Sequence, residues 1–381
     1  MQKNTDLRLA GALLGVFLFA GIFTASAGAE TKAKEKTTTA AGAAERNAQK
    51  NLEVARGNPL QLRHFLHGMP KGADLHYHLS GGVYAETFLQ DALVDGLCVN
   101  VKELAFVKCA AAIPEEPQCD DRWKTDEIVP ARAAICQQHL YDALVDSFSM
   151  RGFVPSTGVT AHDHFFDAFG RFSGIRPVHK AEWVDEAATR AAGQNEQHME
   201  LMITPDYEQA ADVAKKVGWT EDFDKLRKEF LSHGLERNVK SAVEEYQETE
   251  RERRKLEHCG QPEAAEACKV DVRYLVQVLR GKAKEIVFAQ LLLAFEAAHS
   301  DPERIVGINF VMPEDGIISM RDYGLHMRMV KYLHVAYPAV HIALHAGELA
   351  YGLVPPEGLC CHVRLAVEAG AERIGHGADV M

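Results

Sequence analysis

The chain contains 381 residues, of which 47% are hydrophobic and 25% are charged, as in a soluble globular protein with one large domain or two smaller ones. The formal net charge is −12, and no basic stretch carries interleaved aromatic residues, which argues against nucleic-acid binding as the main activity. The basic cluster from Arg251 to Lys255 alternates with glutamates and therefore predicts a solvated helix face.

Residues 1–29 have the pattern of an export signal. Lys3 and Arg8 give a positive start, Leu9 to Ile22 form an apolar core, and small residues around Ala27 offer a cleavage site. An uncleaved anchor is the alternative, but the apolar run is shorter than the ~20 residues that span a bilayer. We expect a cleaved signal peptide and an exported protein, periplasmic or secreted, without a membrane span.

Eight cysteines are consistent with an oxidising compartment. We expect a local disulfide between Cys259 and Cys268, and free thiols at Cys360 and Cys361 because adjacent cysteines rarely bridge. A zinc site built from cysteines is the alternative, but the chain has no Cys-x-x-Cys spacing. Four cysteines in one segment allow three pairings, and the sequence does not choose among them: Cys98, Cys109, Cys119 and Cys136.

In the first half of the expected domain, residues that interrupt regular secondary structure delimit the predicted elements. Residues 30–50 are polar and low in complexity and predict a disordered or loosely helical tether, and residues 51–381 form the expected domain. An insertion that forms a cystine-bearing loop or subdomain is expected at about 98–136, where prolines and cysteines interrupt the rhythm. Around it we expect helices at Asn51–His67 and Ala85–Leu97 and a strand at Ala73–Leu79.

In the second half, short strands alternate with longer helices, which indicates βα units around a parallel sheet and hence a (β/α)₈ barrel. The strands are expected at Met199–Thr204, Ile305–Val311, Val340–His345 and Arg373–His376. The helices are expected at Thr220–Lys255, Lys282–His299, Met320–Ala336 and His362–Gly370.

Three histidine motifs lie at the ends of expected strands. His76 and His78 lie two residues apart, so in a strand both side chains point to one face and can bind one Zn²⁺. His345, followed by Ala-Gly-Glu348, and His376, within Arg-Ile-Gly-His-Gly, end later strands. In a parallel barrel functional residues gather at these strand ends, so the pattern predicts one active site.

A second His-x-His, formed by His162 and His164, precedes an expected aromatic helix instead of ending a strand. Contact with metal or substrate is therefore the less favoured interpretation there. The phenylalanines of that helix recur at helical spacing, which favours core packing over pocket lining: Phe165, Phe166, Phe169 and Phe172.

The motifs Met-Pro-Lys-x-x-x-Leu-His-x-His-Leu, His-Ala-Gly-Glu and Arg-Ile-Gly-His-Gly, in this order, resemble the adenosine/AMP deaminase family over roughly residues 60–381. The export signal and the cysteine-bearing insertion after the first strand are similar to its extracellular branch, the adenosine-deaminase-related growth factors. The resemblance implies a barrel of the metal-dependent hydrolase kind, one Zn²⁺ per chain, and hydrolytic deamination of adenosine or a related adenine nucleoside to inosine and ammonia.

Carried over to this sequence, the resemblance implies that His76, His78 and His345 are zinc ligands. It implies that Glu348 protonates the purine ring nitrogen and that His376 orients the attacking water. The Gly347 turn would aim the His345 and Glu348 side chains into one pocket. A zinc-bound water has a pKa near ~7, which suits attack on C6 at neutral pH.

Three departures from the family pattern bear on substrate binding and completeness. Ser80 lies where members commonly carry an acid that contacts the ribose, and Met312 lies in the segment where a backbone N–H serves the purine. The chain ends at Met381, before the Ser-x-Asp-Asp motif with the last zinc ligand and general base. The resemblance therefore implies an incomplete barrel, and we expect the chain on its own to be inactive.

Two other functions stay open at this point. Another metal-dependent amidohydrolase would bind two metal ions, and an exported binding or signalling protein would have lost catalysis. For the deaminase, the expected partner is a small purine nucleoside and not nucleic acid, and a homodimer is allowed for.

Overall fold

The computed structural model describes residues 42–110, 127–156, 158–349, 353–354, 358 and 360–378. The expected signal peptide, the first part of the tether and Cys119 lie outside these residues. The chain divides into two units, residues 1–69 and 70–381, and each is described by itself. Among the described residues, no helix is both long enough and apolar enough to cross a bilayer.

The first unit contains two helices where the sequence predicted one. Residues 42–56 are helical, and α2 spans Pro59–Gly68. The expected helix over Asn51–His67 is interrupted because Asn58 leaves the helical region, with φ of −140°, and its side chain accepts hydrogen bonds from the N–H groups of Leu60 and Gln61. Asn58 is thus an N-cap, and Pro59 follows at the first helical position, where its missing N–H costs nothing.

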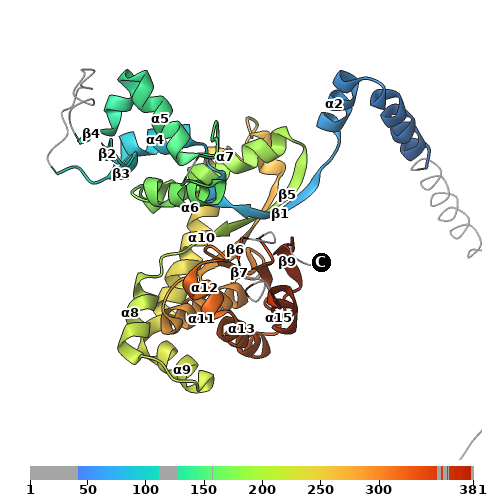
Figure 1. Cartoon of the computed structure of the whole chain (residues 1–381). Helices are drawn as coiled ribbons and strands as arrows, with labels where there is room; N and C mark the ends of the chain where they lie inside the picture. The colour runs from blue at the N-terminus through green and yellow to red at the C-terminus, as the bar shows by residue number, and fades with distance from the viewer. Residues whose placement is uncertain are drawn as a thin grey trace, which may run out of the picture. The chain divides into compact units, whose positions relative to one another are not determined.

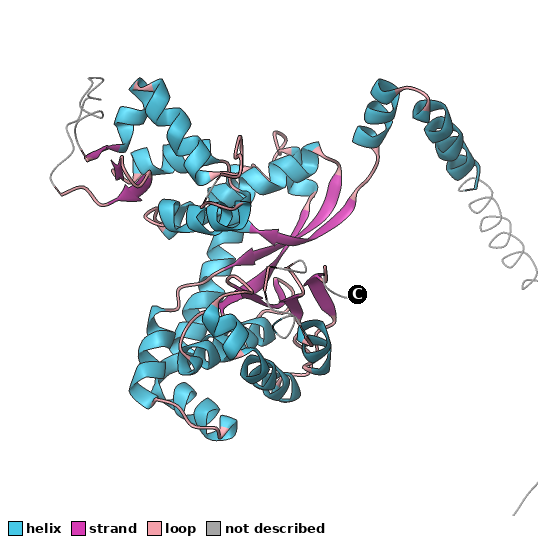
Figure 2. Cartoon of the chain, in the orientation of Figure 1, coloured by secondary structure: helices cyan, strands magenta, loops and turns pink. Residues whose placement is uncertain are grey.

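Parallel strands form the centre of the second unit (Figures 1 and 2). Four strands pair in the order β1-β5-β6-β7, and β8 pairs in parallel with β9. A parallel bridge between Ile308 and Ile342 joins β7 to the residue before β8. The strands are β1 (Gly72–His78), β5 (Glu196–Ile203), β6 (Asp271–Leu279), β7 (Ile305–Val311), β8 (Ala343–Ala346) and β9 (Arg373–His376).

Helices connect and surround these strands (Figure 2). They are α3 (Leu79–Gly82), α4 (Ala85–Val94), α5 (Gln138–Phe148), α6 (Ala161–Phe172), α7 (Lys180–Gly193), α8 (Glu208–Val217), α9 (Phe223–Phe230), α10 (Glu236–Leu256), α11 (Lys284–Ser300), α12 (Ile317–Arg321), α13 (Tyr323–Ala336) and α15 (His362–Glu368). Helix α11 is apolar on most sides and is almost wholly buried. Parallel strands in chain order with helical crossovers confirm the expected fold class, an incomplete (β/α)₈ barrel.

The cysteine-bearing segment forms a small antiparallel sheet of its own. Strands β2 (Cys98–Asn100), β3 (Ala105–Val107) and β4 (Ile128–Pro130) pair in the order β3-β2-β4. A disulfide joins Cys98 to Cys109. This segment precedes α5, so the chain leaves the parallel sheet after β1 and returns to it only at β5.

Of the two expectations for the remaining cysteines, one is correct and one is wrong. The Cys259–Cys268 disulfide is confirmed. Free thiols at Cys360 and Cys361 are wrong, because the two residues are joined to each other. Cys361 has a left-handed φ of 81°.

The expected helix over Thr220–Lys255 is divided. Helix α9 ends at Phe230, a π-type turn follows over Leu231–Leu235, and α10 begins at Glu236. Gly234 has a φ of 108°, which lies outside the helical region and is readily adopted by glycine.

The expected solvated face of the basic cluster is wrong for Arg253. Its side chain is only 1% exposed and donates hydrogen bonds to Glu250 and Glu257. Arg253 follows Tyr246 and Thr249 at helical spacing on the inward face of α10, so helical periodicity buries it.

Candidate metal centre

Four histidines from three strands meet at one edge of the parallel sheet. His76 and His78 lie at the end of β1, His345 lies in β8, and His376 ends β9. Because parallel strands present their carboxyl ends at the same edge, residues nearly 300 positions apart in sequence become neighbours.

The imidazole rings are within contact distance of one another. The His76 and His345 ring centroids are 4.6 Å apart, those of His78 and His345 4.9 Å, and those of His76 and His376 4.9 Å. The Nε2 atoms of His78 and His345 are 3.0 Å apart. One nitrogen each of His76, His345 and His376 lies within 4.8 Å of the others. The predicted trio is therefore brought together, and His376 lies beside it.

The environment favours the neutral form of three of these imidazoles, those of His76, His78 and His345. Burial, followed by the nearby His78, His376 and Arg373, lowers the pKa of His76 to about 4. Burial also lowers the pKa of His78 and takes that of His345 well below its ordinary value. A neutral imidazole offers a nitrogen lone pair, which a cation needs and a protonated ring lacks.

Two side-chain carboxamides orient the His78 and His345 rings through hydrogen bonds at Nδ1. His78 Nδ1 hydrogen-bonds to Oε1 of Gln277, and Nε2 of Gln277 donates to Thr204 at 2.7 Å. His345 Nδ1 is 2.5 Å from Oδ1 of Asn309. Each carbonyl oxygen accepts the Nδ1–H, so Nε2 of each ring carries the lone pair and faces the cluster. This is the usual support of a metal-binding histidine.

The residues fit a zinc ion. Nε2 of His76 is buried and has no hydrogen-bond partner among the described residues, which is costly unless a ligand supplies one. Two nitrogens bound to one Zn²⁺ at 2.0–2.1 Å are roughly 3.3 Å apart in tetrahedral geometry, close to the separation of His78 and His345. Neutral imidazole donors without cysteine suit Zn²⁺ better than Mg²⁺ or Ca²⁺.

Glu348 is the carboxyl group beside this cluster. Its Oε1 lies 3.8 Å from Nε2 of His376. Burial raises the pKa of the Glu348 carboxyl and outweighs the opposite effects of His376 and Arg280. A raised pKa favours the protonated form, which can act as a general acid.

Glu314 holds the backbone that carries Glu348. Its two oxygens accept hydrogen bonds from the N–H groups of Gly347, at 3.0 Å, and Glu348, at 2.6 Å. His362 Nδ1 lies 2.6 Å from the same carboxylate. Gly347 has a φ of 65°, so the turn that the sequence suggested is formed there.

The two remaining predicted substrate residues lie beside the centre without a recorded contact to its histidines. Ser80, in α3, lines a small cavity with Phe165 and Phe169 of α6. Met312 has a φ of 110°, its carbonyl accepts a hydrogen bond from Arg280 at 3.3 Å, and its side chain lies against Gly281. The Met312 side chain therefore lies against the segment that follows β6.

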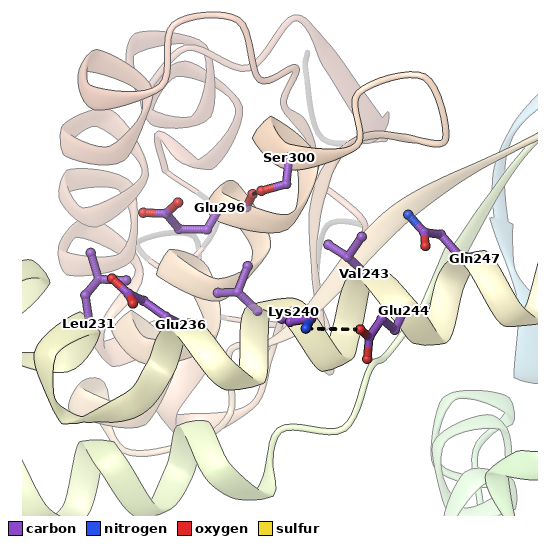
Figure 3. A pocket seen from close by; sticks show the side chains of 9 residues that line it. Leu231, Glu236, Lys240, Val243, Glu244, Gln247, Glu296 and Ser300 are labelled. Atoms are coloured by element: carbon purple, nitrogen blue, oxygen red, sulfur yellow. Dashed lines mark hydrogen bonds and ion pairs between the residues drawn. The ribbon is translucent and has the colours of Figure 1, made fainter.

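A cavity of about 490 Å³ reaches the cluster between β1 and β9, with His76 and His376 in its lining. A cavity of similar volume lies elsewhere, between α10 and α11 (Figure 3). Lys240 and Glu244 in its lining form an ion pair at 3.7 Å, and the lining contains neither histidine nor cysteine. Of these two cavities, the first adjoins the histidine cluster.

No protein-family model and no curated protein matches the sequence. Similar solved structures include an adenine deaminase from Arthrobacter aurescens, with 15% identity over 81% of this chain and 65% of that chain and a TM-score of 0.42. Arabidopsis ADAL complexed with GMP shares 16% identity over 82% and 66%, with a TM-score of 0.43. An amidohydrolase from Burkholderia ambifaria with bound Zn shares 16% identity over 83% and 61%, with a TM-score of 0.42. The chain spans less than two thirds of these proteins, so its activity is argued from its own site.

Sequence reasoning missed Gln277 and Glu314 as members of the site. Gln277 lies in β6, a strand that the sequence did not predict. A lone carboxamide near the end of the apolar run Tyr-Leu-Val-Gln-Val-Leu was the available signal. For Glu314 the signal was weaker, since a glutamate four residues after Phe310 has no motif of its own.

Proposed function

We propose that the protein is a zinc-dependent hydrolase that deaminates adenosine or a related adenine nucleoside to inosine and ammonia. The observation that carries this proposal is the meeting of neutral strand-end histidines with one protonatable carboxyl group, Glu348. The order of the three motifs along the chain supports the same chemistry.

The histidines have separate roles in this proposal. His76, His78 and His345 hold the zinc ion through the nitrogens that face the cluster. When bound, zinc lowers the pKa of a water molecule toward about 7 and thereby supplies the nucleophile. His376 lies between this group and Glu348, where it can accept or donate a hydrogen bond to the water.

Glu348 supplies the proton that the reaction needs. Deamination at C6 is easier when the neighbouring ring nitrogen is protonated, because electron density is then drawn away from C6. Burial raises the pKa of the Glu348 carboxyl, which favours its protonated form and suits it to deliver a proton to that nitrogen. Glu314 fixes the Gly347–Glu348 backbone, so the acid is held at one place relative to the metal ligands.

The test is an ultraviolet assay of adenosine conversion to inosine by the purified full-length protein, with its metal content measured on the same sample. Turnover with one zinc per chain supports the proposal. Two metals per chain would favour another amidohydrolase instead. A folded, zinc-loaded protein without turnover would favour a binding or signalling role.

We also propose that the protein is exported. The signal-like N-terminus and the disulfides Cys98–Cys109 and Cys259–Cys268 support this location, because such bonds persist in oxidising compartments. N-terminal sequencing of the mature protein tests it. A chain that begins near residue 30, in periplasm or medium, is expected, and a chain that retains Met1 in the cytosol would contradict it.

A further inference from the structure

The second His-x-His of the sequence divides into two different environments. His164 is buried, and its Nε2 lies 3.1 Å from the carbonyl oxygen of Asp146 and 2.9 Å from that of Ser149. Its ring stacks on Phe153 at 4.4 Å. A histidine with these contacts anchors the connection between α5 and α6 and needs no further role.

His162, in contrast, is partly exposed and pairs with a residue of a distant loop. Its side chain is 29% exposed, and its Nε2 lies 3.1 Å from Oδ1 of Asp315, 153 residues further along the chain. Asp315 directly follows Glu314, whose carboxylate holds the backbone of Glu348. His162 is also close enough for its charge to act on the Glu348 carboxyl. The His162–Asp315 pair therefore lies beside the candidate acid and is open to solvent.

Helix α6 extends across the site from this pair to the first histidine motif. A Cβ atom on Gly81 would lie 3.3 Å from Cζ of Phe169, so the helix contacts the turn that follows His78. Ser80, Phe165 and Phe169 line a small cavity of about 50 Å³ at this end. The first turn of α6 thus stands near Glu348, and its later turns stand near the zinc ligands' strand.

We propose that His162 and Asp315 bind the hydroxyl groups of the substrate's sugar, and that they select a nucleoside over both the free base and the nucleotide. This inference rests on the proposed deaminase function. A carboxylate accepts hydrogen bonds from two hydroxyls, and an imidazole supplies a donor or an acceptor beside it.

The charge around the pair favours a neutral sugar over a phosphate. His162 lies between two carboxylates, Asp315 at 3.1 Å and Asp163 at 3.3 Å. A phosphate dianion placed at this pair would be repelled by both carboxylates, whereas sugar hydroxyls gain hydrogen bonds from them.

The experiment compares adenosine, adenine and AMP on the full-length wild-type protein and on Asp315→Asn and His162→Ala. Loss of a charged hydrogen-bonding partner should raise KM for adenosine about tenfold or more, with kcat nearly unchanged and the parameters for adenine unaltered. Asp315→Asn should also raise the preference for AMP relative to adenosine. Asp167→Asn is the matched control, because it makes the same Asp-to-Asn change at an exposed position of α6, the helix that carries His162, and should alter none of these ratios.

Calorimetric binding of adenosine and adenine separates this inference from the proposed function. If the wild type binds adenosine more tightly than adenine and both variants lose that difference, the result supports the proposed sugar-binding site. This conclusion does not depend on turnover. Unchanged ratios in both variants overturn it, and so does a wild type that binds neither compound. A wild type that prefers AMP overturns the selection against nucleotides.

Discussion

Gly375 offers the sharpest test of the histidine cluster, because β9 passes His76 so closely that only glycine fits. A Cβ atom on Gly375 would lie 2.7 Å from Nδ1 of His76 and closer still to the neighbouring ring carbon. Ordinary contacts begin at 3.4 Å, so in a densely packed site the ring must shift by about 0.7 Å or more. Gly375→Ala therefore displaces a predicted zinc ligand without removing any of its atoms.

The expected cost has two parts. Overpacking of this kind destabilises by about 1–3 kcal/mol, which leaves a protein of this size folded. A displacement approaching 1 Å at a reacting centre costs about 100-fold in rate. Gly375→Ala should therefore bind zinc more weakly and lose most of its deaminase activity while its circular dichroism stays native.

The matched control is Gly324→Ala in α13, where an added Cβ meets nothing within 4 Å. It should keep full zinc content and activity, and an alanine in a helix should stabilise it by about 0.5–1 kcal/mol. Metal analysis after dialysis, the adenosine assay and thermal unfolding give the three readouts. A Gly375→Ala protein with wild-type zinc affinity and rate would refute the inferred position of His76.

Three further predictions concern the carboxylates and the metal. Glu348→Gln should lower kcat about 100- to 10,000-fold in the adenosine assay while zinc content is kept, and a rate close to wild type would exclude Glu348 as the acid. Burial raises the pKa of Glu314, but hydrogen bonds from His362, Glu348 and Gly347 and the charge of Arg280 more than offset it and hold the pKa at about 2. A lowered pKa stabilises the fold above the unfolded value of about 4.5, by about 3 kcal/mol, and this is lost as the pH falls toward 2. Urea unfolding measured from pH 7 to pH 3 should therefore show that the free energy of unfolding falls less in Glu314→Gln than in the wild type. An equal decrease in both proteins would contradict this prediction. A ligand at 100 times its Kd stabilises by about 2.7 kcal/mol, so chelation should lower the melting temperature by several degrees and added zinc should restore it. An unchanged temperature after measured zinc loss would show that the metal does not support the fold.

The strands were predictable where apolar runs end in turns, and one was missed for a chemical reason. Strands β7 and β9 match their expected bounds because Ile305–Val311 and Arg373–His376 are short and bounded by turn residues. Strand β6 was missed because it begins with charged residues and contains Gln277. Gln277 hydrogen-bonds to His78, so the polar residue that made the strand hard to predict is also the one that supports the site.

The histidines of the site were predictable, but their support was not. His-x-His and His-x-x-Glu have fixed local spacings, so short segments reveal them. Glu314 and Asp315 act through contacts with Gly347 and His162 at distances of 33 and 153 residues along the chain, and no local pattern encodes such pairs. Likewise, both members of the second His-x-His look alike in sequence, and only packing separates the anchor His164 from the open His162.

The pKa values of Glu314 and Glu348 are shifted in opposite directions, and this contrast supports different roles for the two glutamates. Glu314 accepts several hydrogen bonds from fixed donors, so its ionised form is stabilised and it serves as a permanent anchor. Glu348 is buried without such donors, so its protonated form is favoured. The completely buried Arg280 interacts with both, yet its Nε and Nη1 have no hydrogen-bond partner among the described residues. Its charge therefore acts at a distance: it helps to keep Glu314 ionised without forming the direct ion pair that would deprotonate Glu348. Environments that shift the pKa values of two neighbouring carboxyl groups apart suit one group to act as an acid and the other to act as support. The proposed acid, Glu348, is the one that lies beside His376.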